Sequence, residues 1–281
     1  MNKFNLALTL AMDAHEGQIR KGTENKLGVP VPYISHPVAV ASLVVRYDGD
    51  EDQVIAALLH DVLEDGNPEV DWVSRISVFG DRVLRIVESC TDGKPDPATG
   101  KKALWRDRKE LYLDHLKDAT PDVLLVSACD KLNNLQAIHL DLVETGLSVF
   151  DRFSAGRDDV LWYYRTLCEI FTKRGVVVAG ALCKELVAVE AKVKELQQLE
   201  LSAIPKVLLD NPGKYWDATT SNIPLRQAAK DNRYSGYADA YTTENLVACL
   251  RVGGCVDIHS GPFDTADKAS YALDVRWESP E

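Results

Sequence analysis

Apolar residues recur at spacings of three and four along the chain as far as Ser202, which is the pattern of amphipathic helices. Stretches rich in glycine, proline and charged residues separate these segments, as expected for loops between helices. The pattern therefore predicts a mainly α fold. The expected helices cover residues 4–19, 36–44, 54–65, 68–78, 80–89, 104–116, 121–142, 156–171 and 177–201, with loops over residues 23–33 and 91–100.

Individual residues mark where some of these helices begin and end. Ser35 is the expected N-cap of its helix, because a serine side chain can accept from the first free amides, and Pro37 suits the first turn. A loop-to-helix junction at this place directs His36 inward. Gly66 and Gly146 follow two of the apolar runs and are expected to stop those helices.

A buried segment is expected inside the helix over residues 121–142. Positions 123–129 are apolar on every side, so this part of the helix must be surrounded by protein. Asp130 follows directly after the run. A carboxylate in such a place needs an ion-pair partner, such as Lys131 or a buried arginine, or a metal ion, because an isolated buried charge is costly. A metal ion explains it better than pairing does.

The composition changes after Ser202, where prolines and a run of Asn, Asp, Thr and Ser replace the helical spacing. Residues 256–259 and 271–277 are expected to form short strands that flank a turn or helix around residues 265–269. We therefore expect two parts. Residues 1–202 form the main helical domain, and residues 203–281 form a linker and a small C-terminal α+β appendage of unknown role.

The charge of the chain limits its partners. Its formal net charge is -11 over 281 residues, while the hydrophobic fraction of 46% and the charged fraction of 27% are those of an ordinary soluble globular protein. This balance disfavours nonspecific binding to nucleic acid or to an anionic membrane. A phosphate-bearing ligand would have to meet a local basic patch. The basic run over residues 101–109 is expected to be a solvated helix face.

The cysteines and the apolar runs predict a cytoplasmic protein. The six cysteines are scattered without a CxxC pair, which is typical of reduced thiols. No small-residue cleavage site follows the apolar residues 6–12, so no secretory signal is expected. The longest apolar run, residues 176–183, is far shorter than the roughly 20 residues of a membrane span.

The sequence His60-Asp61-Val62-Leu63-Glu64-Asp65 places four polar side chains at the end of an apolar helix. A solvated helix end is one interpretation, and a binding site is the other, because buried imidazoles and carboxylates need partners. His36 and Asp130 are two further candidate ligands from separate helices. Two histidines and two aspartates suit a divalent ion such as manganese, iron, magnesium or zinc, and the imidazoles make magnesium the least favoured of these. Such an ion would acidify a bound water and polarise a phosphoryl oxygen.

Five motifs follow one another within residues 4–174. They are Arg20-Lys21-Gly22, Pro32-Tyr33-Ile34-Ser35-His36-Pro37, Ala57-Leu58-Leu59-His60-Asp61-Val62-Leu63-Glu64-Asp65, Arg108-Lys109 and Cys129-Asp130-Lys131-Leu132-Asn133-Asn134. In this order they resemble the HD-domain hydrolases of the RelA/SpoT family, and most closely the small stand-alone alarmone hydrolases of the metazoan SpoT homologue type.

The resemblance implies an HD-domain helical bundle that uses manganese to remove the 3′-pyrophosphate from (p)ppGpp, the stringent-response alarmone, giving GDP or GTP and pyrophosphate. By matching position, the implied metal ligands are His36, His60, Asp61 and Asp130. Glu64 and Asp65 would orient or deprotonate the attacking water, and Asp65 would also protonate the leaving group.

The resemblance also implies residues that bind the substrate. Arg20 and Lys21 would hold phosphates, although basic residues near a helix C-terminus are also favoured by its dipole. Asn134 would line the nucleoside site. Either Tyr163 or Tyr164 would lie near the base, with plain core packing of both tyrosines as the alternative.

The chain departs from the family pattern after Asp130. The family commonly reads Asp-Arg-Leu-His-Asn-Met-Arg-Thr, whereas this chain has Asn133 at a polar lining position and Gln136 and Ala137 in place of an arginine and a hydroxyl. The metal ligands are retained, but groups that could read guanosine are lost. This motivates an alternative, another HD-domain nucleotide phosphohydrolase acting on NADPH, a (d)NTP or a nucleoside monophosphate.

A third hypothesis is a non-catalytic nucleotide-binding or antitoxin-like partner protein with residues 203–281 as its interaction surface. The presence of Glu64 and Asp65 argues against it, because a pure binder needs no groups that activate water. The helix over residues 177–201 is expected to be a core helix, with a dimer contact as the alternative. His15, His115, His139 and His259 belong to no cluster and are expected to be structural.

Overall fold

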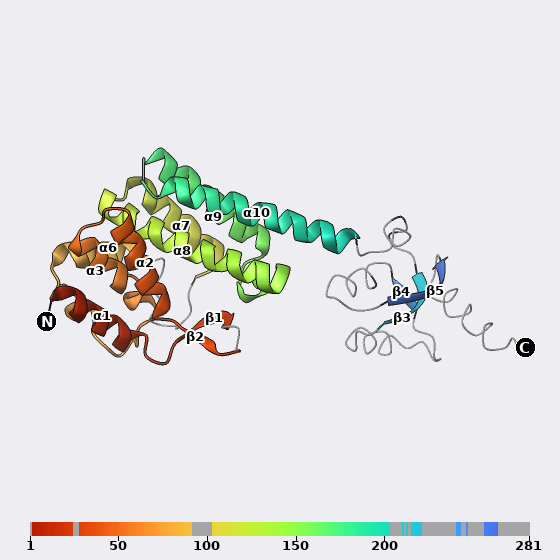
Figure 1. Cartoon of the computed structure of the whole chain (residues 1–281), viewed down its shortest axis with the longest axis horizontal. Coiled ribbons are helices and arrows are strands. Elements are labelled where there is room, and N and C mark those ends of the chain that lie inside the picture. The colour runs from red at the N-terminus through yellow and green to blue at the C-terminus, as the bar shows by residue number, and fades with distance from the viewer. Residues whose placement is uncertain are drawn as a thin grey trace, which may run out of the picture. The chain divides into compact units, whose positions relative to one another are not determined.

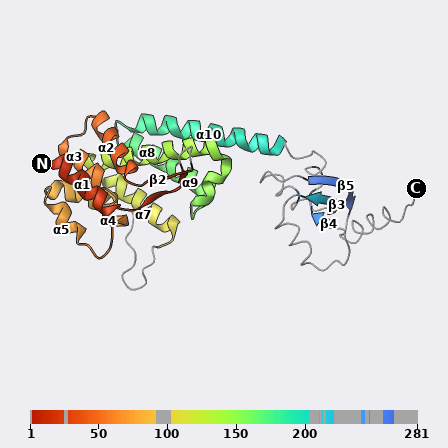
Figure 2. The same cartoon turned by 60° about the horizontal axis from the view of Figure 1, so that its bottom comes forward.

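The structure is a computed structural model that describes residues 2–24, 28–91, 103–202, 210, 212, 215–220, 240–242, 246 and 256–263. Helices dominate the described chain and confirm the mainly α prediction (Figures 1 and 2). They are α1 (Lys3–Ala14), α2 (Ser35–Arg46), α3 (Glu51–Leu59), α4 (Val62–Asp65), α5 (Trp72–Ser77), α6 (Asp81–Cys90), α7 (Trp105–Asp118), α8 (Pro121–Thr145), the 3-10 helix η1 (Gly146–Arg152), α9 (Arg157–Lys173) and α10 (Ala179–Ser202).

The chain divides into two compact units, Met1–Val193 and Lys194–Glu281, so that α10 runs from the first into the second. The sequence placed a boundary after residue 202, and the division into two domains stays a prediction. In the first unit α10 is a core helix as expected, because its apolar stripe of Leu182, Leu186, Val189 and Val193 is at most 5% exposed.

The core of the first unit lies around α3 and α8. Helices α1, α2 and α6 contact α3, while α2, α3, α6, α9 and η1 contact α8. The predicted buried run of α8 is confirmed, since its residues from Val123 to Asp130 are buried except for the half-buried Leu125. The charged Asp130 is only 5% exposed. The helix that was expected to be surrounded by protein is therefore the one that carries a carboxylate into the core.

The expected continuous helix over residues 54–65 is wrong in one respect. Helix α3 ends at Leu59 and α4 begins at Val62, so His60 and Asp61 form the joint between them. Their backbone stays near helical values, with φ −60° and ψ −32° at His60 and φ −93° and ψ −6° at Asp61. The apolar spacing therefore continues across the joint, and spacing alone could not show it. Gly66 is the C-cap of α4, as predicted.

The N-terminal helix and the loop after it also differ from expectation. Helix α1 ends at Ala14, and Gly17 adopts a positive φ of 71°, which favours glycine and turns the chain. Strands β1 (Ile19–Glu24) and β2 (Pro30–Pro32) then pair antiparallel where the sequence predicted a helix end and a loop. The prolines of β2 suggested a loop, and pairing between separate segments leaves little local signal. This hairpin carries Arg20 and Lys21.

The prediction of Ser35 as an N-cap is wrong as well. Ser35 is already the first residue of α2, and its hydroxyl donates to the carbonyl of Pro32 at 2.8 Å instead of capping the helix. The prediction that His36 points inward is nevertheless confirmed, because its side chain is buried and His36 is only 3% exposed. Gly146 is the C-cap of α8 with φ 69°, as expected.

The second unit contains a three-stranded antiparallel sheet of order β4-β3-β5, made of β3 (Tyr215–Thr220), β4 (Ala240–Thr242) and β5 (Val256–Phe263). Strand β5 includes the predicted strand over residues 256–259. The expected strand over residues 271–277 and the turn around residues 265–269 lie outside the described residues, as does nearly all of the expected loop over residues 91–100.

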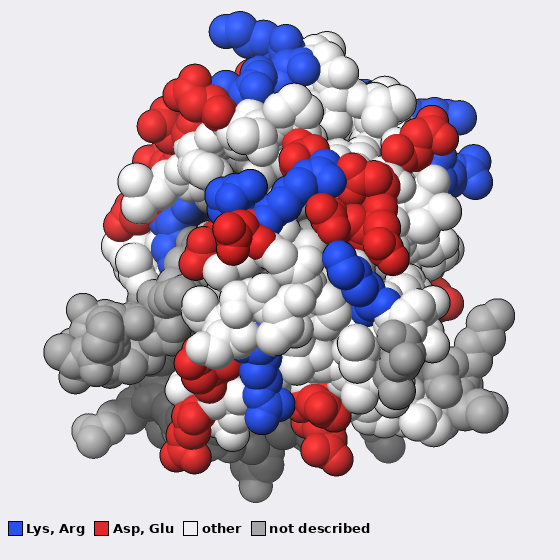
Figure 3. Space-filling model, turned by 90° about the vertical axis from the view of Figure 1, so that its left-hand side faces the viewer, with Lys and Arg blue, Asp and Glu red and all other residues white. Residues whose placement is uncertain are grey.

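The surface charges, the cysteines and the lengths of the helices bear on the expectations from composition. Lys and Arg side chains alternate with Asp and Glu side chains on the face shown in Figure 3. The four described cysteines are free thiols, in agreement with their scattered spacing. Among the described helices, none has the length and apolar character needed to cross a membrane.

Candidate functional site

The four predicted metal ligands come together in the core of the first unit. We call them the His–Asp cluster, and they are His36 in the first turn of α2, His60 and Asp61 at the α3–α4 joint, and Asp130 in α8. His36 Nε2 lies 3.1 Å from Asp130 Oδ1 and 3.5 Å from Asp61 Oδ2. His60 Nε2 lies 3.1 Å from Asp61 Oδ2 and 3.6 Å from Asp130 Oδ1. Three separate parts of the chain thus direct two nitrogens and two oxygens at one point.

The cluster fits a divalent metal ion. One ligand atom each of His36, His60 and Asp130 lies within 4.8 Å of the others, and all three residues are buried. His60 Nε2 is buried without a hydrogen-bond partner among the described residues, although Asp61 Oδ2 is near. A buried polar atom left without a partner is costly, and a metal ion would satisfy it. Mixed imidazole and carboxylate donors suit a divalent transition metal.

The protonation of the cluster depends on its own charges. Burial disfavours the charged imidazoles, but the two aspartates outweigh it and raise the pKa of His36 and of His60. Burial likewise disfavours ionised carboxylates, yet His60 lowers the pKa of Asp61, and Lys131 and the two histidines lower the pKa of Asp130. A divalent ion must therefore displace protons from the imidazoles, and its affinity should increase with pH.

Neighbouring side chains hold the two carboxylates of the cluster. The hydroxyl of Tyr33 donates to Asp61 Oδ2 at 2.5 Å, and Lys131 Nζ donates to Asp130 Oδ2 at 2.6 Å. Asn134 Nδ2 donates to Asp130 Oδ1 at 2.5 Å. The sequence offered Lys131 as an ion-pair partner of Asp130, and the two residues do pair. It gave no role to Tyr33, although Tyr33 stands inside a quoted motif, three residues before His36, and that position was the signal that could have indicated it.

A cavity of about 780 Å³ lies beside the cluster, between the β1–β2 hairpin, α4, α7, α8, η1 and α9. Its lining includes six basic residues and two carboxylates, although the whole chain has a net charge of -11. The cavity is therefore the local basic patch that a phosphate ligand requires. The basic residues are Arg20, Lys21, Arg108, Lys109, Lys131 and Arg152, and the carboxylates are those of Glu64 and Asp65.

Every residue that the sequence predicted for catalysis or substrate binding borders this cavity, namely Arg20, Lys21, Glu64, Asp65, Asn134 and Tyr163. Arg20 Nη2 donates to Asn134 Oδ1 at 3.1 Å, so the amide of Asn134 links this arginine to Asp130. Tyr163 and Tyr164 are 4% and 5% exposed and both border the cavity, so core burial and a place at the site are compatible. The roles of these residues stay predictions.

Two further residue groups differ from expectation. Arg108 and Lys109 were expected on a solvated face, but both border the cavity, and Lys109 Nζ lies 5.0 Å from the ring centroid of Tyr163. Arg106 instead pairs with Glu110 and Asp159. Gln136 and Ala137, the departures expected to affect nucleotide reading, are not among the described lining residues.

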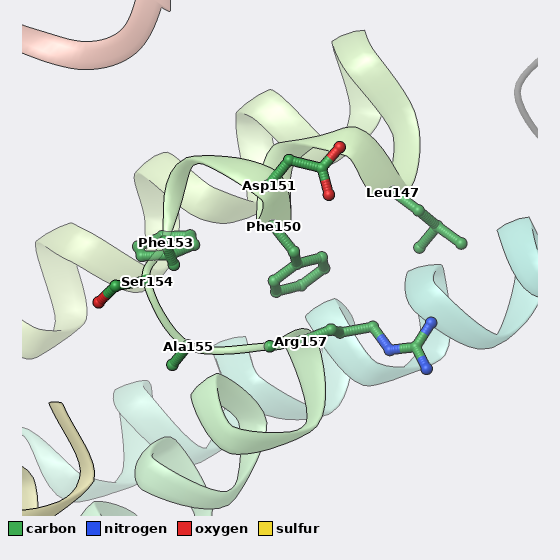
Figure 4. A pocket seen from close by; sticks show the side chains of 8 residues that line it. Leu147, Phe150, Asp151, Phe153, Ser154, Ala155 and Arg157 are labelled. Atoms are coloured by element: carbon green, nitrogen blue, oxygen red, sulfur yellow. The ribbon is translucent and has the colours of Figure 1, made fainter. Parts of the chain in front are cut away.

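A second cavity, of about 500 Å³, lies beside η1 and the loop that leads into α9. Phe150, Leu147 and Arg157 surround it in Figure 4, and Asp151 and Phe153 come from the same segment. It contains none of the predicted site residues. Its lining offers a single basic side chain, so it lacks the concentration of positive charge found in the larger cavity.

Comparison with known proteins supports one family. A model of the HD domain matches residues 7–161. The human guanosine-3′,5′-bis(diphosphate) 3′-pyrophosphohydrolase MESH1 is 36% identical over 135 residues, which are 47% of this chain and 68% of MESH1. The Escherichia coli bifunctional (p)ppGpp synthase/hydrolase SpoT is 31% identical over 144 residues, which are 49% of this chain but only 18% of SpoT.

A Haemophilus influenzae guanosine-3′,5′-bis(diphosphate) 3′-pyrophosphohydrolase is 34% identical over 130 residues, 46% of this chain and 18% of that protein. The solved structure of a metazoan SpoT orthologue that hydrolyses ppGpp aligns with 21% identity and a TM-score of 0.46, over 71% of this chain and 96% of that one. On the strength of the HD-domain match and the similarity to MESH1, the chain belongs to the HD-domain family of (p)ppGpp hydrolases of the metazoan SpoT type.

Proposed function

We infer that this protein is a metal-dependent hydrolase that removes the 3′-pyrophosphate of (p)ppGpp, giving GDP or GTP and pyrophosphate. One observation carries the inference. Glu64 and Asp65 follow the metal-ligand pair by one helical turn and border the same cavity as Arg20 and Lys21. Groups able to activate water and groups able to bind phosphate thus share one space beside the His–Asp cluster. The names of the human and bacterial relatives point to the same substrate.

We propose Mn²⁺ as the ion that His36, His60, Asp61 and Asp130 hold. Their two imidazoles and two carboxylates suit a borderline divalent ion better than magnesium. When bound, the ion would polarise a phosphoryl oxygen and lower the pKa of a nearby water. The observation of this structure that supports a metal at this place is the buried Nε2 of His60, which makes no hydrogen bond of good geometry among the described residues while two carboxylate oxygens lie within 3.6 Å of it.

The reaction transfers the pyrophosphoryl group from the ribose 3′ oxygen to water, so a bond forms between the oxygen of the water and the phosphorus next to the 3′ oxygen. Glu64 accepts a proton from the attacking water, the bond between the 3′ oxygen and phosphorus breaks, and Asp65 supplies a proton to that oxygen. The oxygen of the water leaves in pyrophosphate. Gln18 Nε2 donates to the backbone carbonyl of Asp65 at 2.7 Å and so helps to fix this residue. Arg20 and Lys21 offset the charge of the substrate phosphates.

An enzyme explains the cavity better than a pure binding protein. The carboxylates of Glu64 and Asp65 would repel the phosphates of a nucleotide that is only to be bound, whereas a hydrolase needs them to move protons. Cytoplasmic location, the absence of nucleic-acid and membrane partners, an oligomeric state and a separate role for residues 203–281 stay predictions.

The first test is release of pyrophosphate from ppGpp by the purified protein with Mn²⁺. The double variant His60→Ala, Asp61→Ala should lose more than about 1,000-fold in kcat/KM, because it removes half of the ligand set. A matched control is Asp114→Ala, His115→Ala. Both residues of this adjacent pair are exposed on α7, and Asp114 pairs with Lys117 on the same helix. The control should keep wild-type activity.

A substrate panel then separates the activity from that of other nucleotide phosphohydrolases. NADPH, a dNTP and a nucleoside monophosphate would release orthophosphate or triphosphate, whereas ppGpp yields pyrophosphate. Preference for one of these nucleotides over ppGpp would refute the assigned substrate. Unchanged activity in the His60, Asp61 double variant would refute the metal site itself.

A further inference from the structure

The two imidazoles of the His–Asp cluster are each anchored through Nδ1. His60 Nδ1 lies 2.8 Å from the backbone carbonyl of Ala57, and a carbonyl can only accept, so this nitrogen carries the proton. His36 Nδ1 lies 2.7 Å from the side-chain oxygen of Asn133. In both rings Nε2 faces the point where the carboxylates meet. Once a metal ion displaces the proton of Nε2, a ring that keeps its other proton on Nδ1 offers the Nε2 lone pair to that ion.

The two anchors differ in kind. The anchor of His60 belongs to the backbone of α3, within the same turn, and no side-chain substitution can remove it. The anchor of His36 is the side chain of Asn133 on α8, 97 positions away. The usable tautomer of His36 therefore depends on the residue at position 133. An acceptor there keeps the ring proton on Nδ1, while a donor would move it to Nε2, where it would exclude a metal ion.

Position 133 is also suited to this task by its place on α8. It follows Asp130 by three residues, so one face of α8 supplies a metal ligand and the support of another ligand. Asn133 is not among the described residues that line the large cavity, so contact with the nucleotide does not explain its place.

We propose that Asn133 is a positioning residue for the metal: its Oδ1 holds His36 so that Nε2 faces the cluster, and it sets metal affinity rather than nucleotide selection. The proposal rests on the metal-dependent function inferred above. The sequence alone suggested that Asn133, which departs from the family pattern, changes the lining of the nucleotide site. In the proposal the same residue instead supports a metal ligand.

The test measures binding of Mn²⁺ alone to the full chain by titration calorimetry. Asn133→Leu removes the acceptor at similar size and should raise the Kd for Mn²⁺ by about 10- to 100-fold, the range typical of lost support for a metal-bound histidine. Asn133→Asp keeps an acceptor that cannot become a donor, and should bind Mn²⁺ at least as tightly as the wild type. Asn5→Leu, on the exposed side of α1, is the control for the substitution itself.

Two further readouts separate positioning from a general structural effect. With Zn²⁺ bound, two-bond nitrogen–proton spectra should show His36 protonated at Nδ1 in the wild type and in Asn133→Asp. At saturating Mn²⁺, Asn133→Leu should keep the wild-type KM for ppGpp. Mn²⁺ affinity of Asn133→Leu within twofold of wild type would overturn the proposal, and so would an equal loss of affinity in Asn133→Asp.

The outcomes also distinguish this proposal from the function on which it rests. Wild-type protein that binds Mn²⁺ with the expected dependence on Asn133, but does not hydrolyse ppGpp, would refute the substrate and support the role of Asn133. Wild-type protein that hydrolyses ppGpp, but whose Mn²⁺ affinity is the same in Asn133→Leu, would refute the role of Asn133 alone. Wild-type protein that does not bind Mn²⁺ would refute both.

Discussion

Tyr33 shows how a residue outside the proposed ligand set can orient a proposed ligand. Its hydroxyl donates to Asp61 Oδ2 at 2.5 Å, and its ring centroid lies 4.8 Å from that of His15 and 5.9 Å from that of His36. Burial and the neighbouring Asp61 raise the pKa of Tyr33, so the hydroxyl keeps its proton and can act only as a donor towards the carboxylate. It thereby restricts the orientation of Asp61.

Replacing Tyr33 by phenylalanine should therefore weaken the metal centre while leaving the fold intact. We expect Tyr33→Phe to lower kcat/KM for ppGpp by about 10-fold and to raise the Kd for Mn²⁺, because the variant loses one hydrogen bond that supports a metal-bound carboxylate. Tyr47→Phe, at the end of α2, is the matched control. If both variants hydrolyse ppGpp at the wild-type rate, the hydroxyl of Tyr33 does not support the centre.

At the scale of single residues, the sequence was informative about chemical type and silent about partners that are distant along the chain. His36 and Asp130 stood out because their polar groups occur where the apolar pattern demands burial, and both are buried. The bonds of Tyr33 to Asp61 and of Asn133 to His36 span 28 and 97 positions. Nothing in local composition encodes a contact over such separations, so these supporting roles required the three-dimensional arrangement.

Among the elements that sequence periodicity missed, the β1–β2 hairpin matters for the site. It carries Arg20 and Lys21 into the cavity lining. Its base is closed by a hydrogen bond from the amide of Tyr33 to the carbonyl of Gln18 at 2.9 Å. The helical core, by contrast, was predictable, because burial of apolar stripes fixes helices largely from local spacing. The strands depend on pairing partners that spacing does not reveal.

The N-termini of α3 and α8 are joined through a single basic residue of α6. Arg82 donates to Asp50, the N-cap of α3, at 2.7 Å, to Asp52 at 3.3 Å and to Asp122 in the first turn of α8 at 2.8 Å. His60 is the C-cap of α3, and Asp130 lies within α8. Arg82 thus ties together the scaffold of the His–Asp cluster without touching it.

Removing this link should destabilise the fold modestly. Arg82→Gln should lower the free energy of unfolding at pH 7 by about 1 kcal/mol, since partly exposed ion pairs contribute little each but act here as a network. Urea denaturation followed by circular dichroism measures the change. Arg85→Gln, an exposed arginine on the same helix, should change stability far less. An equal loss in both variants would show that Arg82 has no special role.

The effect of Arg82→Gln on the free energy of unfolding should depend on pH. Burial disfavours the ionised carboxyl of Asp50, but its bonds to Arg82 and to the amide of Gln53 together outweigh this and lower its pKa from the ordinary 3.8. A lowered pKa stabilises the fold above that value and loses its effect as pH falls through the folded pKa. The stability difference between wild type and Arg82→Gln should therefore shrink below about pH 4. A difference that grows on acidification would contradict this assignment.

At the scale of the whole molecule, the charge distribution reconciles an acidic protein with an anionic substrate. A net charge of -11 repels polyphosphates at long range, but salt screens such repulsion beyond about 8 Å under physiological conditions. The six basic residues of the large cavity act at shorter range, where screening is weak. Overall composition therefore excluded nonspecific phosphate binding while leaving a specific site open.

All residues of the His–Asp cluster and of the large cavity belong to the unit Met1–Val193, which leads to a prediction about the chain as a whole. A protein ending after Ser202 keeps the full apolar stripe of α10 and should hydrolyse ppGpp with kcat/KM within about threefold of the full chain, a difference below ~1 kcal/mol in barrier. A protein ending after Val178 loses α10 and should fail to fold, because Leu182 and Val189 are both 0% exposed. Thermal melting and pyrophosphate release on the two truncations decide the matter. Loss of activity in a folded protein of residues 1–202 would show that the C-terminal segment takes part in the reaction.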